Sequence, residues 1–379
     1  MLKYPFQIKK YRGIFLERKN RFVLSAQINK EIKDCYLPNP GRLWELLIPN
    51  KTELILIKNS KNQRLPFIVL GCRKNENTLL LHTHLTNRVI SELIKNKAFP
   101  FYKEYKVIKE EVKIGNSRFD LLLSDGQKEI YLEIKTCTLF GEKIAMFPDA
   151  ITNRGKRHLR ELGELSDKGF KTALLFAIMN PNIEHFLPAY HIDFEFSKVF
   201  MEVKDKIEIR AIALRWDNTL SHVKNIKEVN IPYDFIKSQL KDRGVYLLII
   251  YLPKEKRIKI GSFEEIDFKE GYYVYIGSAK KGLSKRIARH KRKSKKLHWH
   301  IDYLLEESKI LNDIPIITKF EIECSLAKEI SQISNTSIQN FGSSDCSCIS
   351  HLFYFHNNPL VNEKFIRIIN FYRIDSLAI

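Results

Sequence analysis

The segment SRFDLLLSDGQKEIYLEIKTC, residues 117–137, carries the pattern that most constrains the fold. Two apolar, strand-like runs flank the turn sequence SDGQ, so the segment predicts a β-hairpin. Such a hairpin brings Asp120 beside Glu133. Because residues i and i+2 of a strand share a face, Glu133 and Lys135 are expected to point the same way while their apolar neighbours point into the core.

This triad has a specific chemical meaning. Two carboxylates at such a separation are suited to a hard cation such as Mg²⁺, or Mn²⁺ in its place, which proteins hold through carboxylates, waters and phosphate oxygens. A neighbouring lysine orients the attacking water or offsets charge on the phosphate. The pattern therefore indicates phosphodiester hydrolysis at Asp120, Glu133 and Lys135. The alternative is a surface ion pair, which contributes little to stability.

The elements expected around the hairpin fit this chemistry. TNRVISELIKNK, residues 86–97, has apolar residues at helical spacing. ITNRGKRHLRELGELSDKG, residues 151–169, predicts a second helix that ends at Gly169, and KTALLFAIM, residues 171–179, predicts a buried strand. The order helix, three strands, helix, strand is the architecture that such a site requires.

The remaining segments predict two further domains. Residues 12–84 alternate short apolar runs with turn signals, which favours a small barrel or sandwich. The regular pattern weakens beyond residue 220, and a new strand begins with RGVYLLIIYL at residue 243. We therefore predict domains at residues 1–85, 86–228 and 229–379.

Composition and charge narrow the class of partner. The chain of 379 residues has 44% hydrophobic residues and a net charge of +20, so a polyanion such as nucleic acid is the first partner to consider. No segment resembles a signal peptide or a membrane span, and the six cysteines are scattered as expected for reduced thiols. These features favour a cytoplasmic protein without a membrane partner, and they leave the oligomeric state open.

An ordered series of motifs adds a family resemblance. NPGRLWELL, SRFDLLL, LEIKTCTL, FPDAITNRGKRHLREL and HFLPAYHIDFEF occur within about residues 12–220. The series resembles the sugar fermentation stimulation protein A family. The resemblance implies a DNA-binding protein with a small OB-like domain ahead of a domain of the PD-(D/E)xK nuclease type. By position, Asp120, Glu133 and Lys135 take the PD-(D/E)xK catalytic places.

Several nearby residues are candidates for supporting roles. Glu111, and with it Glu92, is a candidate for a further acidic metal ligand by position. The expected helix after residue 151 carries Arg154, Lys156 and His158, which would grip phosphates, unless they form an ordinary solvated helix face. The PNPG segment is foremost a tight turn, and the arginine that follows it, Arg42, is expected to contact nucleic-acid backbone.

The last third of the chain contains a second signature. Gly244-Val245-Tyr246 opens one strand and Tyr275-Ile276-Gly277 closes another, which resembles the GIY-YIG nuclease signature with a longer connection than usual. Together with HWHIDYLL, IECSLA and FGSSDCSCISHLFYF, the stretch over about residues 242–356 resembles a largely uncharacterised GIY-YIG-related domain found widely in archaea.

That resemblance implies a second set of site residues. By position, Tyr246 and Tyr275 are the signature tyrosines, Arg286 is the basic residue on the following helix, and Glu323 is the metal-binding glutamate. In the general mechanism the tyrosine helps to activate water and the arginine supports the charge of the transition state. A fold that has kept only binding is the alternative.

A run of positive charge lies inside this module. Ten of the seventeen residues 280–296 are Lys or Arg and none is acidic. We expect a helix across SAKKGLSKRIARHKRKSKK, with Lys285, Arg289 and Lys293 binding phosphate. The alternative is a flexible solvated run.

Thiols and imidazoles also gather in this part of the sequence, and they are the usual zinc ligands. The residues concerned are His290, His298, His300, Cys324, Cys346, Cys348 and His351. Because no C-x2-C pair occurs, the sequence disfavours zinc. His298 or His300 would instead assist proton transfer near the tyrosines, although a structural hydrogen bond is the more ordinary role for each.

The sequence thus predicts an α+β multidomain protein with an OB-like small β-barrel, a PD-(D/E)xK nuclease-type α/β core and a GIY-YIG-like α+β domain. The favoured function is a Mg²⁺-dependent nuclease acting on nucleic acid, DNA before RNA. The main alternative is a non-catalytic DNA-binding regulator without sequence specificity, which the family resemblance associates with sugar or maltose metabolism. A purely structural basic protein would explain the charge but not Glu133 and Lys135.

Overall fold

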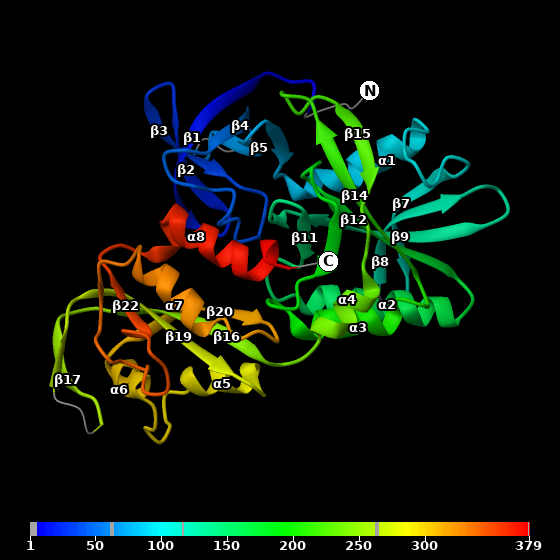
Figure 1. The fold of residues 1–379 in the computed structure, drawn as a ribbon. Coiled ribbons are helices and arrows are strands. Elements are labelled where there is room, and N and C mark those ends of the chain that lie inside the picture. The colour runs from blue at the N-terminus through cyan, green and yellow to red at the C-terminus, as the bar shows by residue number, and fades with distance from the viewer. Residues whose placement is uncertain (1–5, 61–63, 116, 262–264, 378) are drawn as a thin grey trace. The chain divides into compact units, whose positions relative to one another are not determined.

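The computed structural model describes residues 6–60, 64–115, 117–261, 265–377 and 379 (Figure 1). The chain divides into two compact units, one up to Lys237 and one from Ser238. Among the helices formed by these described residues, none is both long and apolar enough to cross a membrane.

The first unit begins with a closed β-barrel. Its strands are β1 (Lys10–Asn20), β2 (Val23–Ile28), β3 (Glu31–Tyr36), β4 (Glu53–Lys58), β5 (Phe67–Lys74) and β6 (Asn77–Leu80). Strand β1 pairs with both β2 and β4, β2 pairs with β3, and β4 pairs with β5. A short parallel pairing of β3 with β5, at Cys35 and Tyr36, closes the ring. The expected small OB-like barrel is therefore confirmed.

An α/β domain follows the barrel in the same unit. Its elements are η1 (Thr83–Leu85), α1 (Thr86–Lys95), β7 (Lys106–Ile114), β8 (Ser117–Ser124), β9 (Glu129–Cys137), β10 (Leu139–Phe140), β11 (Ile144–Phe147), α2 (Asn153–Asp167), β12 (Lys171–Ile178), β13 (His185–Pro188), α3 (Phe194–Val203), β14 (Glu208–Trp216) and β15 (Val223–Glu228). The main sheet has the order β15-β14-β12-β9-β8-β7, and β10, β11 and β13 form a smaller one. Strands β9, β12 and β14 run parallel. The expected helix, three strands, helix and strand are present as α1, β7–β9, α2 and β12, with the additional short strands β10 and β11 before α2.

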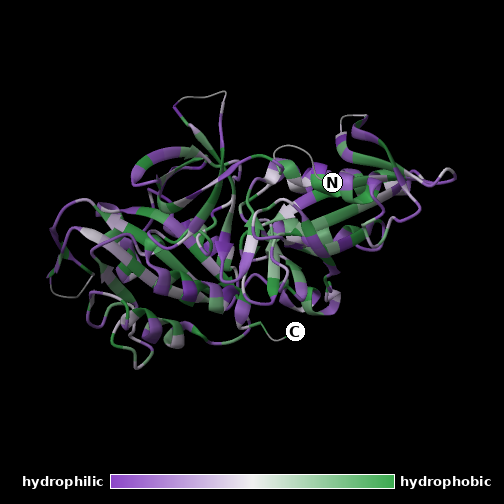
Figure 2. Cartoon of the chain, turned by 90° about the horizontal axis from the view of Figure 1, so that it is seen from above, coloured by the Kyte–Doolittle hydropathy of each residue, from purple (hydrophilic) through white to green (hydrophobic). Residues whose placement is uncertain are grey.

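The helices cover both faces of the main sheet. In Figure 1, α1 lies on one side of the sheet and α2 and α3 lie on the other. Apolar residues of α1, such as Val89 and Ile90, join one buried cluster with Leu121, Leu132 and residues of the barrel. Figure 2 accordingly shows long apolar stretches on the strands and mixed colours on the helices, as expected for helices with one buried face.

Residues at both ends of helix α2 determine where the helix begins and ends. The Thr152 side chain accepts a hydrogen bond from the Gly155 amide at 2.9 Å, which caps the first turn. Gly169, just beyond the last turn, has a φ of +89°, a left-handed conformation that favours glycine. These two ends fix which residues of α2 face the sheet, His158 among them.

The second unit is an antiparallel α+β module. Helix α4 (Tyr233–Gln239) leads into β16 (Gly244–Leu252), β17 (Lys256–Lys259), β18 (Glu265–Phe268), β19 (Gly271–Ala279), α5 (Leu283–His290), α6 (His300–Glu307), β20 (Lys309–Ile317), α7 (Glu323–Ser331), β21 (Thr336–Ser337), β22 (Leu352–Phe355), η2 (Pro359–Val361), α8 (Glu363–Asn370) and η3 (Phe371–Asp375). The sheet order is β20-β16-β19-β22-β21, and among the described residues β17 pairs with β18 in a separate two-stranded sheet.

One expected helix is shorter than the sequence indicated. Helix α5 covers only Leu283–His290, although we expected it to run through the whole basic segment to residue 296. The segment after His290 places cations at neighbouring helical positions, and like charges one turn apart destabilise a helix. The extra residues between the two halves of the signature, in turn, form the β17–β18 hairpin.

Candidate active site

The first candidate site lies where β8 separates from β9. The ladder between these strands ends at the pair Leu121 and Leu132, so the Ile134 amide lies beyond it. The Asp120 Oδ2 atom accepts this amide hydrogen at 2.7 Å, and its Oδ1 atom accepts a hydrogen bond from Asn87 Nδ2 at 2.6 Å. The two hydrogen bonds fix the Asp120 carboxylate beside Glu133.

Glu133 is the most buried charged group of the site, with an exposed fraction of 3%. Its Oε1 atom lies 2.6 Å from His158 Nδ1 and also accepts a hydrogen bond from Lys135 Nζ. Its Oε2 atom is buried and has no hydrogen-bond partner among the described residues. A buried carboxylate oxygen without a partner is costly, so this atom requires a cation, a water molecule or a ligand.

The two carboxylates have opposite pKa shifts. Burial, with the nearby charge of Glu133, raises the pKa of Asp120 to about 6. Burial also works against ionisation of Glu133, but the hydrogen bond from His158 and the charge of Lys135 outweigh it and hold the pKa of Glu133 below its usual range. Two acids this close repel each other when both are ionised. A bound divalent cation would relieve that repulsion and would bind the Glu133 oxygen that has no hydrogen-bond partner. The residues therefore fit a hard cation such as Mg²⁺.

His158 plays a different role from the expected phosphate contact. The ring is only 4% exposed, and its Nε2 atom lies 3.4 Å from Arg154 Nε while its Nδ1 faces Glu133. A buried ring cannot meet a phosphate group. The prediction for His158 is therefore corrected: it orients a carboxylate. Asn87, which the sequence analysis did not single out, does the same for Asp120.

The other two residues of α2 that were predicted to contact phosphate, Arg154 and Lys156, differ in their exposure to solvent. Arg154 is exposed at the start of α2. Lys156 is 16% exposed and lies 3.3 Å from Asp193 Oδ1, so it fastens α2 to the start of α3 rather than extending into solvent. This pairing corrects the prediction for Lys156, because the ion pair uses the charge that a phosphate would need.

Arg42 lies in the connection between β3 and β4 of the barrel, next to Gly41, which packs closely against Asp149 of the α/β domain. A Cβ atom at Gly41 would lie 1.8 Å from Asp149 Oδ2, so only glycine permits this close approach of the turn to the segment ahead of α2. Arg18 donates hydrogen bonds to the backbone carbonyls of Gly41 and Arg42, at 2.5 and 2.6 Å. The Arg42 guanidinium is exposed and stacks over Trp44 at 4.7 Å.

The further acidic ligands expected at this site do not join it. The Glu111 side chain is 69% exposed and lies 3.5 Å from Arg118 Nη1. Within the part of the chain that the structure describes, no group of three or more potential ligands includes Glu111 or Glu92. The Glu111 carboxylate pairs with an arginine on the neighbouring strand, and its role as a metal ligand stays a prediction. The site consists of two carboxylates and the three side chains that hold them.

The second candidate site lies on β16 and β19. These strands pair with Tyr246 opposite Gly277. A Cβ atom on Gly277 would lie 2.6 Å from the Tyr246 hydroxyl oxygen, so a glycine is required for the tyrosine ring to lie across this position. The rings of Tyr246 and Tyr275 are 6.2 Å apart. The signature residues of the two strands are therefore brought together despite the long connection.

His290 is the residue of this site that sequence reasoning underestimated. Its Nε2 atom lies 2.8 Å from the Tyr246 hydroxyl, and its Nδ1 atom lies 3.6 Å from Asp302 Oδ1. Burial lowers the pKa of His290 to about 4, so the ring is neutral and shares a hydrogen bond with the Tyr246 hydroxyl. Histidine was expected here at 298 or 300, but His290 on α5 makes the contact.

The basic helix does not present all of its cations to solvent. Arg289 donates to both oxygens of the fully buried Asp302, at 3.1 and 2.9 Å, and stacks over Trp299 at 4.1 Å. The expected phosphate contact at Arg289 is therefore corrected, because a buried carboxylate already neutralises this arginine. Lys285 and Lys293, by contrast, are exposed.

Arg286 and Glu323 complete the second site. Arg286 Nη1 donates to the Ser278 carbonyl at 2.9 Å, which aims its guanidinium along β19. Burial raises the pKa of Tyr275, the charge of Glu323 adds to this effect and Arg286 opposes it. The two charged groups therefore act on the same hydroxyl. Glu323, at the start of α7, also lies 3.2 Å from His351 Nδ1.

The first unit thus defines a class of protein in which an OB barrel precedes an α/β domain with two neighbouring carboxylates, one of them buried. Comparisons with known proteins agree with that division. The family described as the SfsA N-terminal OB domain matches residues 16–81, and the sugar fermentation stimulation protein RE domain matches residues 84–219. Residues 245–373 match a domain of unknown function, DUF123.

Individual relatives identify the family. A sugar fermentation stimulation protein homolog from Thermosipho melanesiensis is 38% identical over 222 residues, which are 59% of this chain and 94% of the relative. One from Methanothermobacter thermautotrophicus is 30% identical over 54% of this chain and 93% of its own length. The chain belongs to the sugar fermentation stimulation protein family.

A solved structure gives the same result. Pyrococcus furiosus SfsA in complex with Ca²⁺ is 28% identical and aligns with 59% of this chain and 96% of its own, with a TM-score of 0.54. These relatives match between 54% and 59% of the chain, so the matched part leaves a large remainder in which the DUF123 match lies.

Proposed function

We propose that this protein is a metal-dependent nuclease in which Asp120, Glu133 and Lys135 are catalytic residues. The observation that carries the proposal is the buried Oε2 atom of Glu133, which has no partner among the described residues, together with the half-buried carboxylate of Asp120 beside it. A site built only for stability would pair that oxygen, because an unsatisfied buried acceptor destabilises a fold by about 1–3 kcal/mol.

The metal ligands would be Asp120 and Glu133. Mg²⁺ is the favoured ion and Mn²⁺ the alternative, because both prefer carboxylate, water and phosphate oxygens. The solved Pyrococcus furiosus relative is a complex with Ca²⁺, another hard cation with oxygen ligands. That complex supports a cation-binding role for the α/β domain or the barrel that the two chains share.

Each side chain then has a definite task. When bound, the metal ion supplies Lewis-acid polarisation of a phosphoryl oxygen and a more acidic water molecule. Lys135, 16% exposed beside Glu133, directs its charge to the phosphate as negative charge develops there. His158 and Asn87 hold the two carboxylates in orientation, as groups around a metal site commonly do.

Nucleic acid is the substrate that the rest of the chain favours, DNA first and RNA as the alternative. The net charge of +20 attracts a polyanion, and OB folds commonly bind oligonucleotides. Arg42 in the β3–β4 connection and Arg154 at the start of α2 are exposed, so both are candidates for phosphate contacts.

We further propose that the second unit is a GIY-YIG-type nuclease module. The register of Tyr246 with Gly277 and the combined influence of Arg286 and Glu323 on Tyr275 support this assignment. Burial raises the pKa of Tyr246, so its hydroxyl stays protonated. Neutral His290, at 2.8 Å, can take that proton while the tyrosine oxygen takes one from water.

The test is cleavage of labelled single-stranded and double-stranded DNA and RNA by the full chain, with Mg²⁺ or with EDTA. Glu133→Ala should remove the metal-stimulated cleavage that the first site contributes and leave only that of the second unit. Glu129→Ala is the matched control, because Glu129 is an exposed acid on the same strand. Salt-sensitive binding without cleavage in the unaltered protein would reject the nuclease and favour the DNA-binding regulator.

A further inference from the structure

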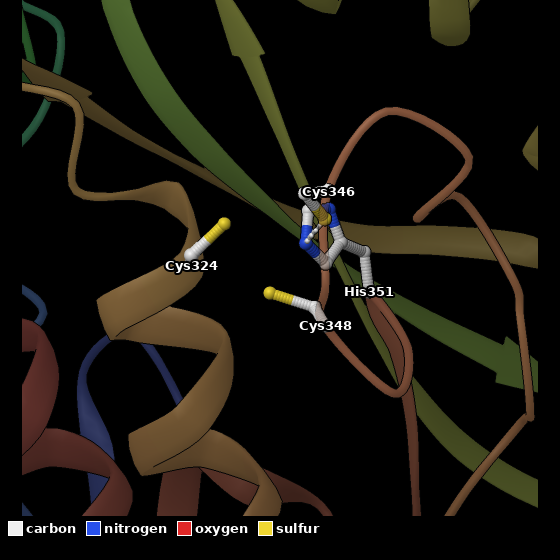
Figure 3. A group of neighbouring side chains, drawn as sticks. All are labelled: Cys324, Cys346, Cys348 and His351. Carbon is white, nitrogen blue, oxygen red and sulfur yellow. Dashed lines mark hydrogen bonds between the residues drawn. The ribbon is translucent and has the colours of Figure 1, made fainter.

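Three cysteines and one histidine of the second unit converge at one point. Cys324 is the second residue of α7, whereas Cys346, Cys348 and His351 come from the segment between β21 and β22. The two sulfur atoms of Cys324 and Cys348 point toward each other in Figure 3, and Cys346 lies beside the His351 ring. The four ligand atoms all lie within 4.8 Å of one another. We call these four residues the Cys3His cluster.

The cluster differs from the other cysteines of the chain. Cys35, Cys72 and Cys137 are buried, and none of them belongs to a group of potential metal ligands among the described residues. Within the cluster, by contrast, Cys346 Sγ lies 3.5 Å from His351 Nε2, and every thiol is at least partly exposed. Six thiols in one chain thus fall into three isolated core residues and one group.

The donor atoms select a particular kind of ion. Three sulfurs and one imidazole nitrogen form a standard set for a closed tetrahedral zinc site. With Zn–S bonds of about 2.3 Å, neighbouring ligands of a tetrahedron are roughly 3.8 Å apart. Separations of up to 4.8 Å therefore need only a small inward movement. Mg²⁺ and Ca²⁺ are disfavoured because they require oxygen ligands.

We propose that the Cys3His cluster holds one structural Zn²⁺ ion. This reverses the interpretation of the sequence, which disfavoured zinc because the chain has no C-x2-C pair. Two of the ligands, Cys346 and Cys348, are separated by a single residue, and Cys324 is supplied by a helix that only the tertiary fold brings near. The proposal is independent of cleavage, because it concerns the folding of the second unit.

The surroundings of the cluster indicate what the ion would hold together. His351 is 3% exposed, and its second ring nitrogen, Nδ1, lies 3.2 Å from Glu323 Oε1. Histidines that bind zinc usually direct the other ring nitrogen to a carboxylate in this way. The His351 carbonyl accepts a hydrogen bond from the Ile276 amide of β19 at 2.9 Å. The ion would therefore join the first turn of α7 to the strand that carries Tyr275.

The experiment measures zinc in the full chain after purification without chelators, by inductively coupled plasma mass spectrometry. We expect about one zinc per chain, because four protein ligands close such a site. Cys324→Ser and Cys346→Ser should each carry almost none. Ser347→Ala, an exposed residue between two ligands, and Cys35→Ala, a thiol outside the cluster, should keep the full amount.

A second measurement needs no variant and so does not depend on how a variant folds. Reduced, metal-depleted protein titrated with Co²⁺ should develop the intense visible bands of tetrahedral cobalt bound to thiolates, with an endpoint of one equivalent, and Zn²⁺ should displace them. No such bands in protein whose six thiols titrate as free would overturn the proposal. So would a disulfide within the cluster of the native protein, or full zinc content in Cys324→Ser.

Discussion

The two candidate catalytic sites satisfy their buried acids in opposite ways. In the first unit, Glu133 keeps one oxygen without a partner among the described residues, and Asp120 and Glu133 repel each other. In the second unit, the buried Asp302 receives two hydrogen bonds from Arg289 and two from the backbone amides of His298 and Trp299. The first site therefore leaves one carboxylate oxygen without a partner despite the nearby Lys135, whereas both oxygens of the buried acid in the second site are hydrogen-bonded.

Because of this difference, we expect the activities of the two sites to depend on different conditions. The first site is proposed to bind a cation, so its cleavage activity should depend closely on metal concentration. In the second site the Tyr246 hydroxyl lies 2.8 Å from neutral His290, and we propose that this pair relays a proton, with Glu323 as the expected metal ligand. Experiments that change one site and leave the other intact test whether this contrast is real.

The largest effect is expected from the relay of the second site. In an Asp120→Asn background, Tyr246→Phe should lower the remaining cleavage by about 10²–10⁴-fold, the usual range for removal of an acid–base group. Gel-based cleavage rates measure this change. Tyr272→Phe is the control, because Tyr272 lies on the same sheet but packs against Tyr251 instead. Equal residual rates in all three proteins would mean that the second unit only binds.

The next effect concerns pH. Burial holds the pKa of His290 near 4, whereas an unfolded histidine titrates near 6.5. Above pH 6.5 both states are neutral, so this histidine does not oppose folding. As pH falls from 6.5 towards 4, only the unfolded chain takes up the proton, so the second unit loses stability, by roughly 3 kcal/mol at the limit.

Hydrogen exchange of the β16 and β19 amides, followed in urea at several pH values, measures this loss of stability. In His290→Gln the same interval should show a much flatter dependence. An NMR titration of His290 in the native protein gives its pKa directly. A midpoint near 6.5 would contradict the neutral relay.

A smaller effect distinguishes the metal dependence of the sites. His158→Asn should raise the Mg²⁺ concentration for half-maximal cleavage by about 10–100-fold, because partners that orient a metal-binding carboxylate commonly contribute that much. His290→Gln should leave this concentration unchanged. Arg157→Gln serves as the control on α2, since Arg157 is exposed. An unchanged Mg²⁺ requirement in His158→Asn would remove the carboxylates from the metal site.

The smallest effect concerns the exposed cations of the second unit. Replacing Lys285 and Lys293 by Gln should lower the slope of log affinity against log salt by about one for each phosphate group that the protein no longer neutralises. Fluorescence anisotropy with labelled DNA measures the slope. Lys254→Gln is the matched control, an exposed lysine in the β16–β17 connection. If the double variant keeps the slope of the unaltered protein, these lysines are an ordinary solvated surface.

The sequence predicted the structural features that depend on residues close together in the chain. The hairpin that brings Asp120 beside Glu133 follows from two strand patterns and one turn, and the structure has that pairing. The barrel also followed from spacing, because short strands separated by turns have few other arrangements. Local patterns were sufficient wherever one hydrogen-bond ladder decides which residues meet.

The sequence did not predict what distant elements contribute. Asn87 and His158 reach the carboxylates from two helices, and nothing in their own surroundings marks them as partners. The sequence did not show that Arg289 pairs with a buried acid, because a paired arginine cannot be told from an exposed one within a run of basic residues. The Cys3His cluster was missed for the same reason: its spacing along the chain lacks the short pairs by which zinc sites are usually found.

The β17–β18 hairpin has a practical consequence. It lengthens the chain between the two halves of the tyrosine signature, yet β16 and β19 keep their pairing along nine residues each. Among the described residues, its strands pair only with each other. The added residues of this connection therefore leave the pairing of β16 with β19 unchanged. The connection is a natural place to graft a fluorescent reporter or an affinity handle onto the second unit.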